Sequence, residues 1–245
     1  MNTRPSNVTA APDDPAESLA RLREATARWV AQERTRARLT TGMEALDGLL
    51  GGGWPQGRVG ELVGPPCSGR TAVAMATVAA ATSRGEVVAW IDAADAFDPV
   101  SATAAGVELD RVLWVHPGDL EKTVRAAELC LDLCGFGVVV VDLAGAAARR
   151  ERHGGKGKAL RLVRAVERAG AVALVLAERP WVGTLAGVTV ALGRGAAEWR
   201  GGERGAPRWL AGISLRPCIE RGGVGRGAPR RDAGVVAWRA RVVGG

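Results

Sequence analysis

The eight residues at positions 64–71 constrain the fold more than any other stretch of the chain. They read Gly-Pro-Pro-Cys-Ser-Gly-Arg-Thr, which is the spacing G-x-x-x-x-G-[K/R]-T of a phosphate-binding loop, or P-loop. A largely apolar run at 59–63 precedes the loop, and a helix-like segment at 71–81 follows it, as the motif requires. The glycines let successive backbone N–H groups point inward. Together with the positive end of the helix, these groups form an anion site suited to phosphates.

The loop departs from the usual pattern at one position, where Arg70 stands in place of the expected lysine. In one interpretation this is a modified nucleotide loop. In the other, the loop keeps the fold and has lost the nucleotide, because a planar guanidinium is bulkier than an ammonium group between phosphates. The chain has 30 Arg and 3 Lys, so arginine is its usual cation, which favours the first interpretation. The residues that would then bind the cofactor are Gly64, Ser68, Gly69, Arg70 and Thr71, with the Thr71 hydroxyl on Mg²⁺.

Length and composition are typical of one globular domain. At 245 residues, of which 47% are hydrophobic, the chain can bury a full core. No run approaches about 18 consecutive apolar residues, and the first residues lack an apolar signal core, so we expect a cytoplasmic protein without a membrane span. The four cysteines show no metal-ligand spacing, and we expect reduced thiols.

Four segments follow one another along the chain. Residues 1–16 are polar and contain several prolines, and we expect them to be disordered. Residues 17–38 carry apolar side chains at three- and four-residue steps, which predicts a helix. Residues 39–193 contain the strand and helix patterns of the core, and residues 194–245 have the spacing of a basic, β-rich extension of the same domain.

Acidic residues cluster after the strand expected at 86–91. Asp92 ends that strand, and Asp95 and Asp98 follow it closely. Carboxylates at the carboxyl end of a strand beside a P-loop can polarise water or hold the water shell of a metal. The alternative is a set of loop and helix-cap acids.

A second carboxylate follows the strand expected at 136–142, where four valines end in Asp142. Such a run is typical of a buried parallel strand with an acid at its tip. This is the arrangement of a Walker B element, in which Asp142 would accept hydrogen bonds from Mg²⁺-bound water. The position downstream of a P-loop favours this interpretation.

Positive charge gathers in two places. Residues 194–245 hold 11 Arg against 4 acidic residues, a net charge of +7, while residues 1–193 balance at 22 of each sign. This asymmetry favours a polyanionic partner such as DNA, although a solvated arginine-rich surface is the alternative. Residues 149–158, RRERHGGKGK, are expected to form a flexible basic loop for phosphate contact, or else a solvated linker. The candidate DNA-binding residues are Arg149, Arg150, Arg152, Lys156, Lys158, Arg230 and Arg231.

Three tryptophans interleave with arginines in the β-like C-terminal segment. They are Trp199, Trp209 and Trp238. Aromatic rings beside cations can stack on the bases of a nucleic acid. The alternative is that these rings are half-buried on one face of a sheet.

In order and spacing, the chain resembles the RecA recombinase family over roughly residues 37–220. The positions that carry the resemblance are Thr41-Gly42, Leu46-Asp47, Gly51 to Gly53, Pro55, Gly57-Arg58, Glu61, Gly64-Pro65, Ser68 to Thr71, Ile91-Asp92-Ala93, Asp98-Pro99 and Gly106-Val107. The resemblance implies an α/β fold: a RecA-like P-loop core with a mainly parallel sheet flanked by helices and an antiparallel C-terminal extension. It also implies ATP at the loop, with Mg²⁺ held by Thr71 and Asp142 and with Arg70 and Asp142 taking part in catalysis.

The departures from the family affect catalysis and DNA contact. Recombinases have Ile-Asp-Ala-Glu where this chain has Ala94 in place of the catalytic glutamate, so Asp95 becomes the candidate substitute base. Ser101 replaces the tyrosine that stacks on adenine, and Glu178 stands near the position of the sensor glutamine. The second DNA loop is shortened to about 179–187, and the recombinase C-terminal lobe has no counterpart. Any hydrolysis of ATP should therefore be slow.

A short, degenerate RecA relative of this kind resembles the ImuA type. The resemblance implies a cytoplasmic, nucleoid-associated accessory factor of SOS-induced mutagenic translesion DNA synthesis, with slow and DNA-stimulated ATP hydrolysis. Its implied partners are DNA, an inactive Y-family polymerase of the ImuB type, an error-prone C-family polymerase and RecA. Two alternatives stay open. One is a non-enzymatic polymerase scaffold with a relic P-loop, and the other is a regulator of RecA filaments acting through residues 17–36. The oligomeric state is also left open.

Overall fold

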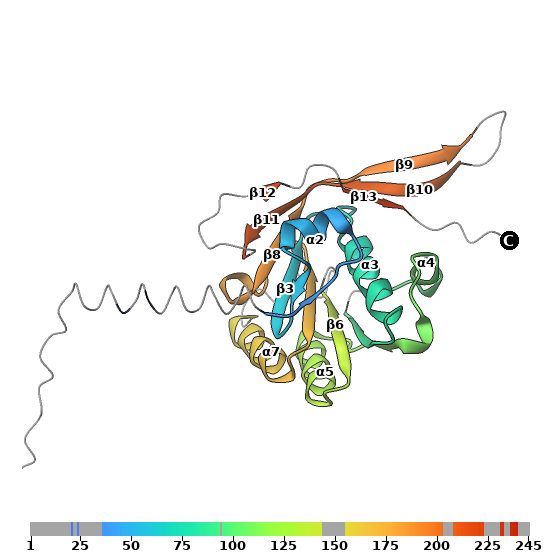
Figure 1. Ribbon diagram of the computed structural model, residues 1–245. Helices are drawn as coiled ribbons and strands as arrows, with labels where there is room; N and C mark the ends of the chain where they lie inside the picture. The colour runs from blue at the N-terminus through green and yellow to red at the C-terminus, as the bar shows by residue number, and fades with distance from the viewer. Residues whose placement is uncertain are drawn as a thin grey trace, which may run out of the picture. The chain divides into compact units, whose positions relative to one another are not determined.

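A computed structural model describes residues 21, 24, 36–93, 95–143, 155–202, 208–222, 231–232 and 236–239 of the chain (Figure 1). The chain divides into two units, Met1–Arg36 and Ala37–Gly245. In the first unit Arg21 and Glu24 are helical, and the tail expected at 1–16 lies outside the described residues. The helix expected at 17–38 is wrong at its end, because Arg38 lies in a short strand, β1 (Arg38–Leu39), that pairs with β2 (Trp54–Pro55).

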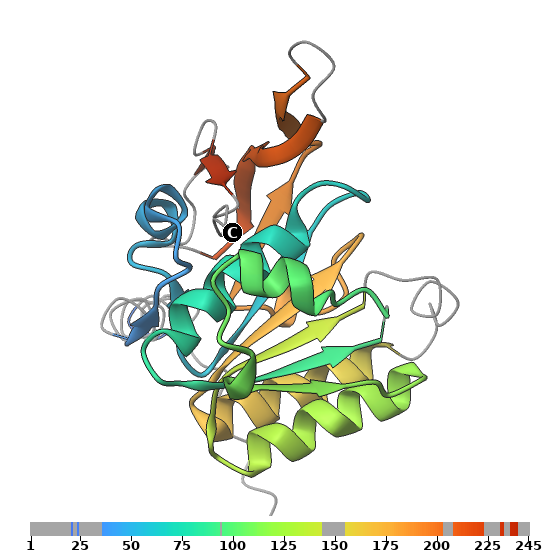
Figure 2. The same ribbon diagram turned by 90° about the vertical axis from the view of Figure 1, so that its right-hand side faces the viewer.

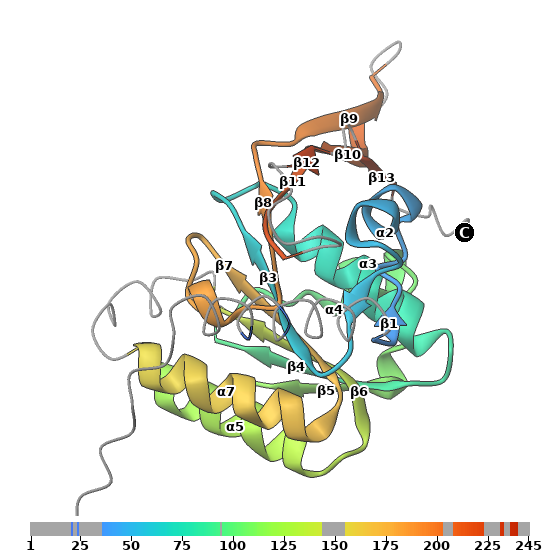
Figure 3. The same cartoon turned by 60° about the vertical axis from the view of Figure 1, so that its left-hand side comes forward.

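An eight-stranded sheet forms the centre of the second unit. Its strands are β3 (Arg58–Val63), β4 (Val87–Asp92), β5 (Val112–Val115), β6 (Phe136–Asp142), β7 (Val172–Ala177), β8 (Val188–Leu192), β11 (Pro217–Arg221) and β12 (Arg231–Asp232). Their order is β12-β11-β8-β3-β7-β6-β4-β5 (Figure 3). All pairs from β8 to β5 are parallel, whereas β11 pairs antiparallel with β8 and with β12. The predicted α/β class with a mainly parallel sheet is confirmed.

Helices cover both faces of this sheet (Figure 2). One face carries α2 (Glu44–Leu50), α3 (Arg70–Thr82) and α4 (Pro99–Ala104), and the other carries α5 (Leu120–Asp132) and α7 (Gly155–Ala169). Two short 3₁₀ turns, η1 (Leu109–Arg111) and η2 (Gly183–Leu185), lie in the connections. Each face of the sheet therefore has its own apolar core.

The valine run of β6 shows why this strand is apolar throughout. Val138 and Val140 belong to the core under α3, and Val139 and Val141 belong to the core under α5 and α7. Successive side chains of a strand point to opposite faces, so a strand between two helical layers has no solvent side. The predicted position of this strand in the interior of the sheet is confirmed.

The C-terminal segment divides between two sheets. β9 (Ala196–Gly201), β10 (Arg208–Leu215) and β13 (Val236–Arg239) form a separate three-stranded antiparallel sheet in the order β13-β10-β9, drawn in orange and red in Figure 1. The segment between β10 and β13 returns to the main sheet as β11 and β12. The main sheet thus continues past residue 193, where we expected the core to end.

The flexible loop expected at 149–158 is wrong at its end. α7 begins at Gly155, so Lys156 and Lys158 lie in a helix and not in that loop. Glycine disfavours helix, but the apolar face of α7 is buried against the core, and tertiary packing decides helix formation more than propensity does. α4 begins at Pro99 because Asp98 caps it and Pro99 fits its first turn. Among the helices that the structure describes, none has the length and apolar character needed to cross a membrane.

Candidate nucleotide-binding site

The loop between β3 and α3 curls around Ser68. Cys67 and Gly69 on either side have φ angles of 62° and 89°, both left-handed, and the Ser68 N–H donates to the Pro65 carbonyl oxygen at 3.2 Å. Left-handed residues in such a turn direct backbone N–H groups into a concave anion site. Gly69 is the N-cap of α3 and has no side chain to accept from the first N–H groups of the helix, so these donors stay available to an anion.

Gly64 and Ser68 pack together at the base of this loop. A Cβ atom at position 64 would lie 2.4 Å from the Leu192 carbonyl oxygen and 2.7 Å from Ser68 Oγ, so only glycine fits. Ser68 is 1% exposed, and its Oγ has no hydrogen-bond partner within the described part of the chain. Leaving a buried hydroxyl unpaired costs about 1–3 kcal/mol. A phosphate oxygen in the loop would accept its hydrogen bond, so this residue fits a bound phosphate.

Arg70 and Thr71 open α3 directly after the loop. Arg70 is buried, with 7% of its surface exposed, and Thr71 is partly exposed. A guanidinium stays charged at all physiological pH values, so the start of α3 keeps a permanent positive charge. The structure therefore brings together in one loop and helix start the five predicted cofactor-binding residues, Gly64, Ser68, Gly69, Arg70 and Thr71.

Two leucines from strands later in the chain, Leu192 of β8 and Leu215 of β10, pack against the loop. The end of β8 places Leu192 against Gly64, and the end of β10 places Leu215 against Gly69. Leu192 and Leu215 are 2% and 1% exposed and belong to the core under α3. The conformation of the loop therefore depends on strands that lie far from it in the sequence, which no local pattern in the sequence indicates.

Asp142 lies at the carboxyl end of β6, at the same edge of the sheet as the loop. It is 1% exposed and stands in register with Leu176 of β7 and Asp92 of β4. One strand, β7, separates β6 from β3. Neighbouring strands are about 4.8 Å apart, so the ends of β6 and β3 are about 10 Å apart across the sheet. This is a suitable place for a carboxylate that acts on a metal ion through water.

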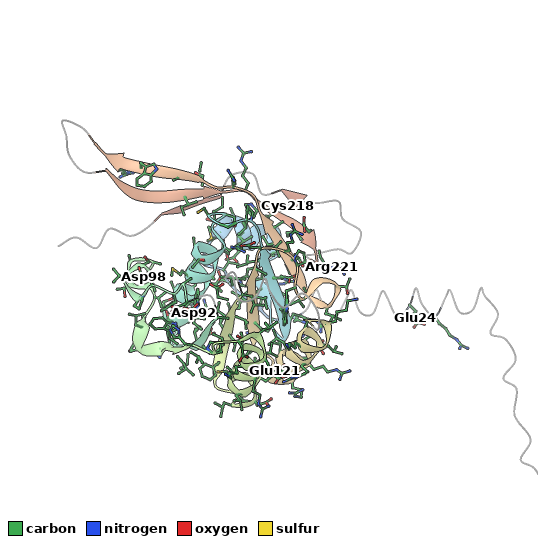
Figure 4. All side chains as sticks on the ribbon, turned by 180° about the vertical axis from the view of Figure 1, so that it is seen from behind. Glu24, Asp92, Asp98, Glu121, Cys218 and Arg221 are labelled. Carbon is green, nitrogen blue, oxygen red and sulfur yellow. The ribbon has the colours of Figure 1, made fainter. Side chains whose placement is uncertain are left out.

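Asp92 and Asp98 have structural roles (Figure 4). Asp92 is 2% exposed, and its carboxylate accepts hydrogen bonds from the backbone N–H groups of Ala96 and Phe97 and from Trp114 Nε1, at 2.9–3.2 Å. Asp98 caps α4, and hydrogen bonds from the hydroxyl and N–H of Ser101 lower the pKa of its carboxyl. For these two residues the interpretation as loop and helix-cap acids is the right one.

Asp95, the candidate substitute base, points to solvent. Its side chain is 86% exposed, its backbone is left-handed with φ 51°, and its Oδ1 lies 3.3 Å from Nδ1 of His116. Ligand atoms of Asp92, Asp95 and His116 all lie within 4.8 Å of one another. His116 was not among the residues predicted for the site from the sequence. Its position directly after β5, beside the end of β4, was the available signal.

Glu61 is a buried acid that holds the segment after β7. The residue is 0% exposed, and its Oε1 accepts hydrogen bonds from the N–H groups of Trp181 and of Val182, the latter at 2.7 Å. Its Oε2 accepts from the N–H of Gly183 at 3.3 Å. Burial raises the pKa of Glu61, and the backbone donors offset part of that effect. Because β3 continues directly into the loop, Glu61 connects the nucleotide loop to residues 181–183.

The predicted DNA-binding residues are separated by the structure. Lys156 is exposed in the first turn of α7, whereas the side chain of Lys158 is only 20% exposed and its Nζ lies 3.6 Å from Oε2 of Glu121. Arg231 lies in β12 at the edge of the main sheet. The remaining predictions, Arg149, Arg150, Arg152 and Arg230, lie outside the described residues.

Comparison with known proteins gives one family. The model of the RecA N-terminal domain matches residues 24–175. Protein RecA of Levilactobacillus brevis is 41% identical over 121 residues, which cover 49% of this chain and 32% of that protein. Protein RecA of Symbiobacterium thermophilum is 43% identical over 105 residues, which cover 42% of this chain and 30% of that protein. The chain thus matches about a third of the length of these relatives.

A solved structure supports the same fold. The crystal structure of the RadB recombinase superimposes with a TM-score of 0.59, covering 82% of this chain and 95% of that chain at 21% sequence identity. At this identity the likeness concerns the fold.

Proposed function

Because this chain belongs to the RecA N-terminal domain family, we propose that it binds ATP with Mg²⁺ at residues 64–71 and acts on DNA as an accessory factor of SOS-induced mutagenic translesion synthesis, of the ImuA type. The observation that carries the proposal is the loop around Ser68. Its buried hydroxyl has no hydrogen-bond partner among the described residues, and the first N–H groups of α3 have no side-chain cap. A triphosphate would satisfy both sets of groups.

Each residue of the site has a separate task in this proposal. The N–H groups of the loop, with Ser68 and Arg70, bind and orient the phosphates, and Thr71 and Asp142 hold Mg²⁺, which neutralises phosphate charge when bound. Asp95 would accept the proton of the attacking water. Its carboxylate faces solvent beside His116. An acid this exposed is poorly held for proton transfer, so hydrolysis should be slow. Stimulation of this hydrolysis by DNA is part of the same proposal.

A fluorescent ATP analogue tests nucleotide binding directly. Titration into the full chain with Mg²⁺ should saturate, and Arg70→Ala should weaken binding by about tenfold or more, since charge-assisted hydrogen bonds to phosphate are lost. Arg70→Lys, which restores the usual P-loop cation, should bind at least as tightly as the natural chain. Binding that does not saturate, or that is equal in all three proteins, contradicts the proposal.

Phosphate release tests whether the chain hydrolyses ATP. The natural chain should release phosphate slowly and faster with single-stranded DNA, and Asp142→Ala should abolish the release. If the variant released phosphate at the natural rate, the activity would come from a contaminant.

DNA binding is proposed from the charge of residues 194–245, whose net is +7. Binding that neutralises about five phosphates should weaken with salt at a log–log slope of roughly −4. A response that is flat in salt would remove the C-terminal arginines from the proposal. A cytoplasmic location beside the nucleoid follows from the same proposed role.

A second candidate function is a non-enzymatic scaffold for translesion polymerases. The observation that favours it is the edge strand β5, where Leu113 and Trp114 are 44% and 39% exposed. Exposed apolar side chains on an open strand edge suit protein contact. Two measurements on the natural chain and on Arg70→Ala separate the two functions. One is pull-down of purified ImuB-type and C-family polymerases, and the other is the level of mutagenesis. A scaffold keeps full binding and full mutagenesis in the variant, whereas a nucleotide-dependent factor loses mutagenesis.

A further inference from the structure

β9 is the outer strand of the sheet formed by β13, β10 and β9. It pairs antiparallel with β10 over residues 196–201, with Trp199 opposite Leu210 and Arg200 opposite Trp209. Figures 1 and 2 show β9 and β10 extending away from the main sheet. The outer edge of β9 has no paired strand among the described residues, and Trp199 and Arg200, which face opposite sides of the strand, are both exposed.

Trp199 is unusually exposed for a tryptophan. It is 55% exposed, whereas Trp54 and Trp90 are 0% exposed in the core, and Trp114 is 39% exposed. A large aromatic ring left in water gives up the free energy that burial would gain, about 25 cal/mol for each Å² of apolar surface. A tryptophan this exposed on a projecting strand has an apolar ring available for contact with a partner.

The charged residues near Trp199 indicate which kind of partner could bind there. Arg194 and Arg200, on either side of it in the chain, are both exposed. Glu198, the acidic neighbour, is partly buried and accepts a hydrogen bond from Ser214 Oγ at 2.8 Å, so it is directed toward β10. Trp199 and Arg200 of β9, with Arg194 just before the strand, therefore offer one aromatic ring and two guanidinium groups, which suits a phosphate backbone with bases beside it.

We propose that β9 binds single-stranded nucleic acid, with one base stacked on Trp199 and with phosphates held by Arg194 and Arg200. Because alternate residues of a strand face opposite sides, a nucleic-acid strand along the outer edge of β9 meets Trp199 on one face and Arg200 on the other. In a duplex both faces of each internal base are covered by neighbouring bases, so stacking on Trp199 requires unpaired bases. The proposal rests on the proposed DNA-binding function and names a site for it.

Fluorescence anisotropy with a fluorescein-labelled oligothymidine and a labelled duplex tests the site in the full chain. Trp199→Ala should weaken binding of the oligothymidine by about tenfold, the value of one lost base stack, and should leave duplex binding nearly unchanged. Trp199→Phe, which keeps a ring, should retain most of the affinity. Leu133→Ala, which removes another exposed apolar side chain, is the control and should bind like the natural chain.

Salt dependence separates the stacked ring from the guanidinium groups. Trp199→Ala should leave the slope of log affinity against log salt unchanged, because no phosphate contact is lost. Arg200→Gln should reduce that slope by about 0.7, the contribution of one phosphate of a single strand. Circular dichroism of each variant checks that the fold is retained.

Every outcome decides the proposal. If the natural chain binds neither oligonucleotide, the DNA-binding function and this site fall together. If it binds DNA and Trp199→Ala binds equally well, or loses both oligonucleotides equally, only this site is wrong. If Trp199→Ala keeps its DNA affinity but no longer captures a purified partner polymerase, β9 is a protein-binding edge and the nucleic-acid proposal is overturned.

Discussion

Leu215 at the end of β10 packs directly on Gly69 of the nucleotide loop: a Cβ atom at position 69 would lie 2.2 Å from Leu215 Cδ2. The two residues are far apart in the sequence, and β10 also pairs with β9, the strand proposed to bind nucleic acid. The nucleotide loop and the three-stranded sheet of β9, β10 and β13 are therefore in direct contact through the side chain of Leu215.

The contact predicts a coupled effect on stability. Gly69→Ala should destabilise the protein by about 1–3 kcal/mol, because alanine is strained at φ 89° and its methyl group displaces Leu215. Leu215→Ala should cost about 2–5 kcal/mol as a cavity in the core. The double variant should lose at least about 0.5 kcal/mol less than the sum of the single losses, since the clash is gone.

Urea denaturation of the four proteins measures this coupling. Gly118→Ala is the matched control, because Gly118 has φ 82° but a Cβ there meets nothing within 4 Å of the described structure. It should show the cost of backbone strain alone and no coupling to Leu215→Ala. Additive losses for Gly69 and Leu215 would contradict the contact.

Glu61 predicts a pH dependence of stability. Its pKa is raised by burial above the ordinary value of 4.5, so the folded protein retains a proton at a pH where the unfolded chain has lost it. The stabilisation from this proton is complete below pH 4.5 and is lost as the pH rises through the raised pKa. Glu61→Gln does not titrate. The free energy of unfolding of the natural chain, minus that of the variant, should fall from pH 4.5 upward in urea titrations, and a rise would contradict the assignment.

Substitution of aspartate by asparagine should affect stability differently at Asp92 and at Asp95. Asp92→Asn places an NH₂ group against backbone donors and should destabilise the protein by about 1–3 kcal/mol. Asp95→Asn alters an exposed side chain and should stay within about 0.5 kcal/mol of the natural chain. If Asp95 accepts the proton of water, Asp95→Asn should reduce DNA-stimulated phosphate release, whereas an unchanged rate would remove Asp95 from the mechanism.

Lys156 and Lys158 lie in one turn of α7 but differ in exposure, and we expect them to have different roles. Lys156→Gln should weaken DNA binding and lower its salt slope, because this side chain is exposed. Lys158 is engaged with Glu121 of α5, so Lys158→Gln should change thermal stability and leave the salt slope unaltered. Anisotropy titrations over a range of salt, with a melting curve for each variant, measure both quantities. Equal loss of DNA affinity in both variants would contradict this division.

The local elements of the site could be predicted from the sequence because each depends on neighbours in the chain. Glycine spacing at 64–71 and the apolar run before it specify a strand, a loop and a helix start. The valines before Asp142 specify a strand covered on both faces. The class of fold and the five residues of the loop follow from such patterns.

At Gly155 the glycine-rich sequence predicts a loop, but in the structure α7 begins at this residue. The buried face of α7 against α5 outweighs the low helix propensity of its first turn, and propensity patterns carry no information on that packing. The acids after β4 show the same limit. The spacing of Asp92, Asp95 and Asp98 is compatible with catalysis or with capping, and only the contacts of each carboxylate distinguish these roles.

By itself, then, the sequence determined which stretches are strands and helices and where a phosphate can bind, because backbone conformation responds to residues a few positions apart. Tertiary structure alone decided that Leu215 supports Gly69, that Glu61 holds residues 181–183 and that His116 meets Asp95. The contacts of Glu61 and His116 arise when the pairing of parallel strands brings their ends to one edge of the sheet, and Leu215 reaches Gly69 because β11, which follows it, pairs antiparallel with β8. That pairing is a property of the whole core and leaves no short-range pattern in the chain.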